Sequence, residues 1–372
     1  MKKYVFVFPL VILLVLQSCG NESTNNITPD SFNRRALLSY YADSLIIPEY
    51  ERLAGTTQIL SNSVTDFINS PTIATLQNAQ NSWIQSYTQW QYCSLFNFGP
   101  AVGTFGTLLE DIATFPVKVS GDQVRKGIED YIIAGDNSLN NFARDTRGFM
   151  GVEYLLFSGT NEEIIAKFMG SEGQKRKNYL QAITQDIHNR VVSCGNSWKS
   201  YTSDFIARNG TDAGSSISEL YNEFVKSFES IKNYKLGIPL GNRVGQTKPE
   251  PATVEAYYSG LGFRMLTYHW QTIVRVWNGQ TRHGHDGIGF KEYIESTVGG
   301  KELSASIVQH IGDVEKSLQQ YPPDKALSDA VINEQAKVNE IFTELQKITR
   351  FFKSDMSSLL GISITYSSGD GD

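Results

Sequence analysis

Apolar side chains recur every three or four residues over long stretches of this chain, and this pattern constrains the fold most strongly. Such spacing gathers the apolar residues on one face of an α-helix. Residues 72–95, 173–204 and 324–359 each keep the pattern over several turns. Helices this long must bury their apolar faces against one another, and modest connecting loops favour antiparallel neighbours. The sequence therefore predicts antiparallel helical bundles.

Strand-like alternation of apolar and polar residues is confined to short segments such as 116–120 and 362–366. Irregular stretches rich in Gly, Pro and Asn separate the helical ones, and either 209–216 or 237–251 would suit a boundary between two halves. The chain is long enough for two domains of ordinary size. We therefore expect an all-α fold of two packed helical bundles, residues 32–210 and 211–372.

The N-terminal segment has the features of a lipoprotein leader. Lys2 and Lys3 precede an apolar run over residues 4–16, which is shorter than the about 20 residues of a membrane-spanning helix. A small residue, Ser18, then stands directly before Cys19, which resembles a lipobox. The alternative is an ordinary secretory signal that has a cysteine near its end.

We expect residues 1–18 to be a signal peptide, Cys19 to be lipidated and residues 19–31 to form a polar, flexible tether. The membrane is then a partner through the lipid anchor. The predicted location is the outer membrane, on its periplasmic or cell-surface face.

The charge balance argues against a nucleic-acid partner. The chain has 33 Lys and Arg against 39 Asp and Glu, a formal net charge of -6, and no basic run. Binding to nucleic acid depends on clustered cations that neutralise phosphates. No nucleic-acid partner is therefore expected.

Catalytic templates are missing as well. The sequence contains no HExxH, GxSxG, Walker or dinucleotide-binding motif and no CxxC pair, so no catalytic residue is predicted. Cys93 and Cys194 lie on apolar helical stripes, which favours two buried thiols over a disulfide in an oxidising compartment.

Glu153 is the most informative ionisable residue, because its immediate neighbours in residues 147–157 are apolar. A buried carboxylate costs several kcal/mol unless it is paired or ligates something. Glu153 is therefore a candidate site residue. The alternative is that it points to solvent or pairs with Arg147.

The segment around Glu153 resembles the GxHxxE segment of the imelysin family. Gly148 and Glu153 match that motif, whereas Met150 stands where the family has histidine. Three further stretches resemble the family in the same order: Trp83 and Trp90 followed by Phe98-Gly99-Pro100, the turn at 111–116, and the tail from Leu360 to Asp372.

This resemblance implies an all-helical, two-domain protein with a functional site at the domain junction, in a family linked to peptidase activity and to iron uptake. Methionine cannot act as a general base and is a weak ligand for hard metals. We therefore expect a binding protein of an iron or other metal uptake system, with an outer-membrane transport partner. The alternatives are a metallopeptidase and a non-catalytic interaction protein.

Residues 257–264 of the second half resemble the family's Ser-Gly helix start, which contributes to the same junction. Gly260 and Gly262 allow close approach of another backbone, so tight interdomain packing is the alternative explanation. Arg264 is a candidate charge partner for Glu153. The predicted ligand-binding set is Arg147, Gly148, Met150, Glu153, Tyr154, Ser259 and Arg264. Glu153 is also the candidate metal ligand, with iron or zinc as the candidate ion.

A second cluster, His283, His285 and Asp286, would place three metal ligands together if the segment were extended. The pattern fits a polar connecting loop better, because no helix would hold the three side chains in place.

Overall fold

The computed structural model of the chain describes Met1 and residues 32–114, 121–139, 143–322 and 324–366. Residues Met1–Ser31 and Phe32–Asp372 form two separate units, and the second contains all of the helices described below. The predicted leader with Cys19, the tether and the segment 116–120 lie outside the described residues.

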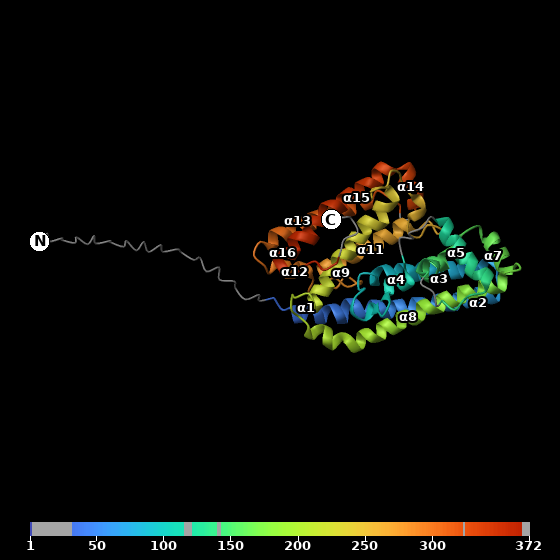
Figure 1. The fold of residues 1–372 in the computed structure, drawn as a ribbon, viewed down its shortest axis with the longest axis horizontal. Helices are drawn as coiled ribbons and strands as arrows, with labels where there is room; N and C mark the ends of the chain where they lie inside the picture. Colours follow the sequence, from blue (N-terminus) through green and yellow to red (C-terminus); the bar gives the residue numbers. More distant parts are fainter. Residues whose placement is uncertain (2–31, 115–120, 140–142, 323, 367–372) are drawn as a thin grey trace. The chain divides into compact units, whose positions relative to one another are not determined.

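The all-α prediction is confirmed (Figure 1). The long helices of the N-terminal half are those predicted from periodicity, with α3 matching 72–95 and α8 matching 173–204. Its helices and turns are α1 Arg34–Tyr40, η1 Tyr41–Ile46, α2 Ile47–Asn69, α3 Ile73–Cys93, η2 Gly99–Ala101, α4 Leu108–Ile112, α5 Gly121–Ala134, η3 Arg144–Thr146, α6 Gly148–Phe157, α7 Asn161–Met169 and α8 Gly173–Ala207.

The C-terminal half continues with shorter helices, and two π-helical turns, η4 and η6, extend α9 and α15. Its helices and turns are α9 Ser216–Ser230, η4 Ile231–Gly237, α10 Ile238–Leu240, η5 Pro251–Thr253, α11 Gly262–Asn278, α12 Phe290–Glu295, α13 Gly300–Leu318, α14 Leu327–Asn333, α15 Gln335–Arg350, η6 Phe351–Asp355 and α16 Met356–Leu360.

Helix α3 shows how local sequence and packing combine. It begins after Thr72, whose hydroxyl and the Thr75 hydroxyl form a reciprocal capping box that satisfies free backbone N–H groups. Its buried face packs on α2 and α6, and Trp83 Nε1 donates to the Phe149 carbonyl over 2.9 Å. The indole thus fixes α3 against α6.

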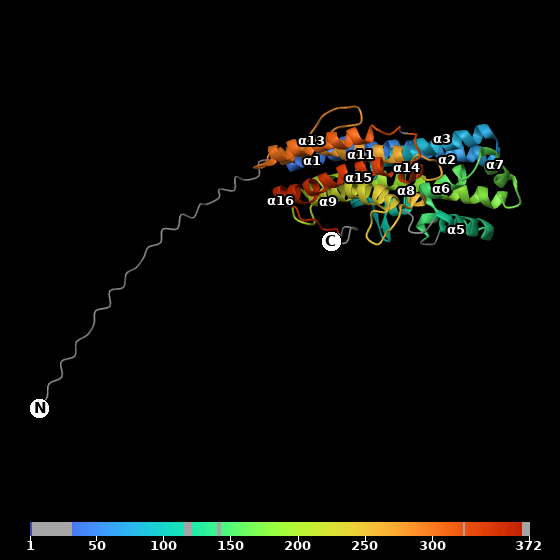
Figure 2. The same cartoon turned by 90° about the horizontal axis from the view of Figure 1, so that it is seen from above.

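Helix α11 joins the two halves, because it packs against α3 on one side and against α9 and η4 on the other. The Thr272 hydroxyl donates to the Gln91 carbonyl of α3 over 3.1 Å. Figures 1 and 2 show α11 beside α9, and α13 and α15 lie side by side. Large aromatic side chains fill the core on both sides, and Trp83, Trp198, Trp270 and Trp277 are fully buried.

The predicted single helix over 324–359 is wrong, because it is divided into α14, α15, η6 and α16. The break lies at Glu334, whose backbone leaves helical geometry with φ -132° and ψ 33°. The Glu334 carboxylate pairs with Lys325 on one side of the break and with Lys337 on the other, the latter at 3.0 Å. The carboxylate at the break thus has a lysine partner on each side.

The strand-like alternation at 362–366 does not form a strand. The segment contacts α9 instead: the Thr365 N–H donates to Asn222 Oδ1 over 2.7 Å, and Asn222 Nδ2 donates to the Ser363 carbonyl over 3.1 Å. Within the described ranges, strand structure is limited to the antiparallel pair β1 Val102–Gly103 and β2 Gly106–Thr107.

The predicted domain boundary near residue 210 falls in the connection between α8 and α9. Residues 32–372 group as one compact unit, so the division into two domains stays a prediction. Among the described helices, none combines the length and the apolar character that crossing a bilayer requires.

Candidate functional site

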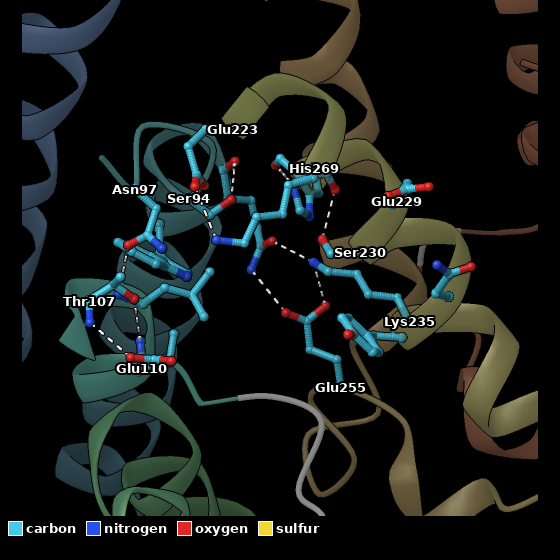
Figure 3. A pocket seen from close by; sticks show the side chains of 18 of the residues that line it. Ser94, Asn97, Thr107, Glu110, Glu223, Glu229, Ser230, Lys235, Glu255 and His269 are labelled. Atoms are coloured by element: carbon cyan, nitrogen blue, oxygen red, sulfur yellow. Dashed lines mark hydrogen bonds and ion pairs between the residues drawn. The ribbon is translucent and has the colours of Figure 1, made fainter. Parts of the chain in front are cut away.

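A cavity of about 200 Å³ lies where the two halves of the helical unit meet. Residues of α3 and α4 line one side, and residues of α9, η4 and α11 line the other (Figure 3). Helical spacing aims these side chains inward: Tyr87, Gln91 and Ser94 lie four and three residues apart along α3. The π-helical turn η4 then brings Lys235 to the same space.

A buried ion pair forms one wall of this cavity. Lys235 Nζ lies 2.7 Å from Glu255 Oε2 and also donates to Gln91 Oε1 over 2.7 Å. The Tyr87 hydroxyl donates to Glu255 Oε1 over 2.6 Å. Burial lowers the pKa of Lys235, and the Glu255 carboxylate opposes that shift. Pairing and hydrogen bonds thus offset the several kcal/mol that each buried charge costs.

His269 offers a neutral imidazole to the same cavity. Its Nε2 lies 2.7 Å from the Ser227 hydroxyl, and its Nδ1 is buried without a hydrogen-bond partner. Burial, together with the Lys235 charge, holds the pKa of His269 well below its usual range. An unpaired buried nitrogen costs about 1–3 kcal/mol, so Nδ1 marks a polar group that the fold leaves unsatisfied beside the cavity.

Two carboxylates of α9, Glu223 and Glu229, also line the cavity. The Glu223 carboxylate lies 3.0 Å from Lys226 Nζ, and burial raises the pKa of Glu223. Glu229 accepts a hydrogen bond from Tyr366 over 2.8 Å and pairs with Lys353 at 3.1 Å. Each of these two carboxylates thus has a lysine partner.

Glu153 lies on α6 and is buried, with 1% of its surface exposed. Its Oε1 accepts hydrogen bonds from the Ser259 N–H over 2.8 Å and from the Ser259 hydroxyl over 2.7 Å. Burial raises the pKa of Glu153 to about 7, and the charge of Glu255 adds to this rise, while the bonds from Ser259 oppose it. The structure thus brings together two predicted site residues that are 106 positions apart in the chain.

Neither predicted charge partner of Glu153 contacts it. Arg147 pairs with Asp111 at 3.2 Å and donates to the Leu139 carbonyl over 2.8 Å. Arg264 is half-buried on α11, and the predicted ion pair to Glu153 is absent from the described contacts. The physical reason is that hydrogen bonds from Ser259 already satisfy the carboxylate.

The other predicted residues have structural surroundings. Gly148 begins α6 with φ +66°, and a Cβ there would lie 2.3 Å from the Ile112 carbonyl oxygen. Met150 is buried on the same helix. Tyr154 donates to Glu129 over 2.7 Å and packs edge-on against Tyr258.

None of the seven predicted ligand-binding residues lines the cavity, so their binding role stays a prediction. Glu153 is nevertheless connected to the cavity by two of its lining residues. Tyr87 and Glu255 line the cavity, and both interact electrostatically with Glu153.

The residues that prediction missed are Lys235, Glu255 and His269. Two of them carry the signal that identified Glu153, an ionisable residue in an apolar setting: Lys235 precedes a Leu-Gly-Ile-Pro-Leu run, and Glu255 stands between Val254 and Ala256. His269 lies in the amphipathic helix α11 and carries no such signal.

The junction does not fit a resident iron or zinc ion. Among the described residues, one group of three His, Cys, Asp or Glu side chains has ligand atoms close enough together to bind one metal ion. This group lies on α13 and α15 and does not include Glu153. At the junction, both bonds from Ser259 go to Glu153 Oε1, and Lys235 and Tyr87 contact the two oxygens of Glu255.

Two further sequence predictions can be compared with the structure. His283 Nε2 lies 3.2 Å from Arg52 Nη2, and Asp286 bridges to Gln280, which agrees with a polar loop. Cys93 and Cys194 are both free and buried, as their apolar stripes indicated.

Known proteins resemble this chain in sequence and in fold. A curated relative, iron-regulated protein A of Synechococcus elongatus, is 21% identical over 257 residues, which cover 66% of this chain and 64% of that protein, less than two thirds of its length. An imelysin-like protein from Psychrobacter arcticum superposes with a TM-score of 0.72 at 19% identity, covering 90% of this chain and 97% of the other.

A protein from Parabacteroides distasonis, provisionally named an iron-regulated protein A precursor, gives a TM-score of 0.70 at 15% identity over 88% of this chain and 95% of its own. These two structures support the fold. The family model described as Imelysin (Peptidase_M75) matches residues 46–350, most of the sequence, and the chain therefore belongs to the imelysin family.

Proposed function

We propose that this imelysin-family chain is a lipid-anchored, extracytoplasmic binding protein that holds a small ligand between its two helical halves and serves iron or other metal uptake. The observation that carries the proposal is the junction cavity with the unpaired His269 Nδ1 beside the Lys235–Glu255 pair. The lining combines the apolar surface of Trp90, Leu109 and Tyr234 with many polar side chains, and polar groups that converge on an enclosed space orient a small molecule.

The lining indicates an organic ligand rather than a bare ion. Trp90, Leu109, Ala113 and Tyr234 supply apolar surface, and the polar groups that face it are mostly paired with one another. A metal that enters already surrounded by its own organic donors needs hydrogen bonds from the protein instead of coordination. A small metal chelate with acceptor oxygens therefore fits best, since Lys235 and His269 are the groups that would meet it.

The anchor and the uptake role are supported by other observations. The leader pattern that ends at Cys19 supports attachment to the outer membrane, and a transport protein of that membrane is the expected partner. The curated relative is named for its regulation by iron, which suggests the same physiological setting for this chain. A metallopeptidase is not proposed, because Met150 replaces the family histidine and the junction lacks a three-ligand cluster among its described residues.

The test fills the cavity. Ser230 lines it from the end of α9, is half-buried and donates to the Ser227 carbonyl, so Ser230→Phe should occupy the space. Ser61→Phe on α2, also half-buried and outside the lining, is the matched control. Calorimetric titration with ferric citrate, citrate and ferrous ion compares the variants, and thermal melting verifies that both fold.

We expect ferric citrate to bind the unmodified protein and Ser230→Phe to weaken binding about tenfold or more, a loss of about 1.4 kcal/mol. Ser61→Phe should leave the affinity unchanged. Absence of binding by all three probes, or an equal effect of both variants, would contradict a ligand site in this cavity.

A further inference from the structure

A second cluster of polar groups lies outside the junction, between α13 and α15. These helices pack side by side in the C-terminal half (Figures 1 and 2). His310 and Asp313 are three residues apart on α13 and therefore share a face, and Glu344 of α15 faces them. Two helices thus contribute an imidazole and two carboxylates to one place.

The spacing of the ligand atoms is close to that of a metal centre. His310 Nδ1 lies 3.6 Å from Asp313 Oδ2, and one atom from each of the three residues falls within 4.8 Å of the others. Two ligands held at about 2.1 Å from one ion, with angles of roughly 90–110°, are about 3.0–3.4 Å apart. Small side-chain rotations would therefore bring all three onto one ion.

The His310 ring is already held for such a role. It stacks on Phe351 with ring centroids 5.1 Å apart and planes 30° from parallel. Its Nδ1 atom is buried and has no hydrogen-bond partner, because the 3.6 Å to Asp313 is too long for a hydrogen bond. A buried nitrogen with an unused lone pair or proton is costly, and coordination to an ion would remove that cost.

We propose that His310 Nδ1 and the Asp313 and Glu344 carboxylates bind one divalent first-row transition ion, with Zn²⁺ or Fe²⁺ as the class, and thereby fasten α13 to α15. One imidazole with two carboxylates suits these ions, and waters would complete the coordination shell. The site is separate from the junction cavity, which lies between other helices.

One competing cation belongs to the protein itself. Lys347 Nζ lies 2.8 Å from Glu344 Oε1 and 2.9 Å from Oε2. Lys347 is about half exposed, so its ion pair is weak and the side chain can turn to solvent when an ion arrives. Competition for Glu344 gives a distinctive prediction: removing the lysine charge should strengthen metal binding.

The experiment titrates the full-length protein with Zn²⁺ by calorimetry and repeats the titration with Fe²⁺ under anaerobic conditions. His310→Ala should weaken Zn²⁺ binding about tenfold or more, since one of three protein ligands is lost. Lys347→Met should strengthen it several-fold. His285→Ala, in the exposed loop before α12, is the control for adventitious binding by surface histidine.

Equal affinity of His310→Ala and the unmodified protein, or an unchanged affinity in Lys347→Met, would overturn the proposal. Thermal melting adds a second measurement: Zn²⁺ should raise the melting temperature of the unmodified protein and leave that of His310→Ala unchanged. Ser230→Phe should bind Zn²⁺ normally, which separates this site from the junction ligand site.

Discussion

Replacing Glu153 with glutamine tests how the junction holds its buried carboxyl group. The pKa of Glu153 is raised from 4.5 to about 7, mainly by burial. Between these two values the folded protein keeps the proton that the unfolded chain releases. The stability from protonated Glu153 is therefore fully present below pH 4.5 and is lost as the pH rises through 7.

The size of this effect follows from the two pKa values. A gap of about 2.5 pH units, at 1.36 kcal/mol for each unit, corresponds to roughly 3 kcal/mol of unfolding free energy. Glutamine keeps an amide oxygen that can accept the bonds from the Ser259 N–H and hydroxyl, and it carries no charge. Glu153→Gln should therefore retain the packing and lose this dependence on pH.

Urea unfolding, followed by tryptophan fluorescence at several values between pH 5 and pH 8, gives the measurement. Other buried groups, including Glu223 and His269, also titrate differently in the folded protein, so the informative quantity is the difference between Glu153→Gln and the unmodified protein. The unfolding free energy of Glu153→Gln, measured relative to that of the unmodified protein, should therefore increase as the pH rises. Glu162→Gln, at an exposed position of α7, is the control. A difference that stays constant with pH would refute the reasoning.

Two further substitutions test the packing of the junction. Gly148→Ala should cost more than about 2 kcal/mol in urea unfolding, because φ is +66° and the new Cβ would meet the Ile112 carbonyl oxygen at 2.3 Å; a cost below about 1 kcal/mol would contradict that geometry. Lys235→Met should cost about 3–5 kcal/mol at pH 7, because it leaves Glu255 buried without its partner. The double variant Lys235→Met/Glu255→Gln should recover most of that loss, and failure to recover would mean that the pair is not the source of the cost.

The fold could be predicted from sequence where structure is set locally. The periodicity of α3 and α8 is contained within each helix, so it could be interpreted without knowledge of the neighbours. At Glu334 the backbone leaves helical geometry, and the Glu334 carboxylate pairs with Lys325 and Lys337. Periodicity continues through such a break, and this is why one long helix was predicted over 324–359.

The residues of the candidate site also fall into those that the local sequence indicates and those that only the packing of the helices brings together. Glu153 stood out because its neighbours in the sequence are apolar, and resemblance to a family placed Ser259 at the same junction. Arg264 was proposed as its partner on charge alone, yet a backbone N–H and a hydroxyl satisfy the carboxylate. His269 was missed, because the cavity it lines arises from helices of both halves and has no pattern in any one of them.

The junction therefore has a particular electrostatic character. Glu255 is paired with Lys235, Glu153 is held by Ser259 with its pKa near neutrality, and His269 is kept neutral by burial and by the nearby lysine. Charges that are already paired have little attraction left for a ligand charge. Recognition at this cavity should then rest on shape and neutral hydrogen bonds, which salt screens only weakly. The metal cluster on α13 and α15 is the opposite case, because two carboxylates there share a single exposed lysine and attract a cation directly.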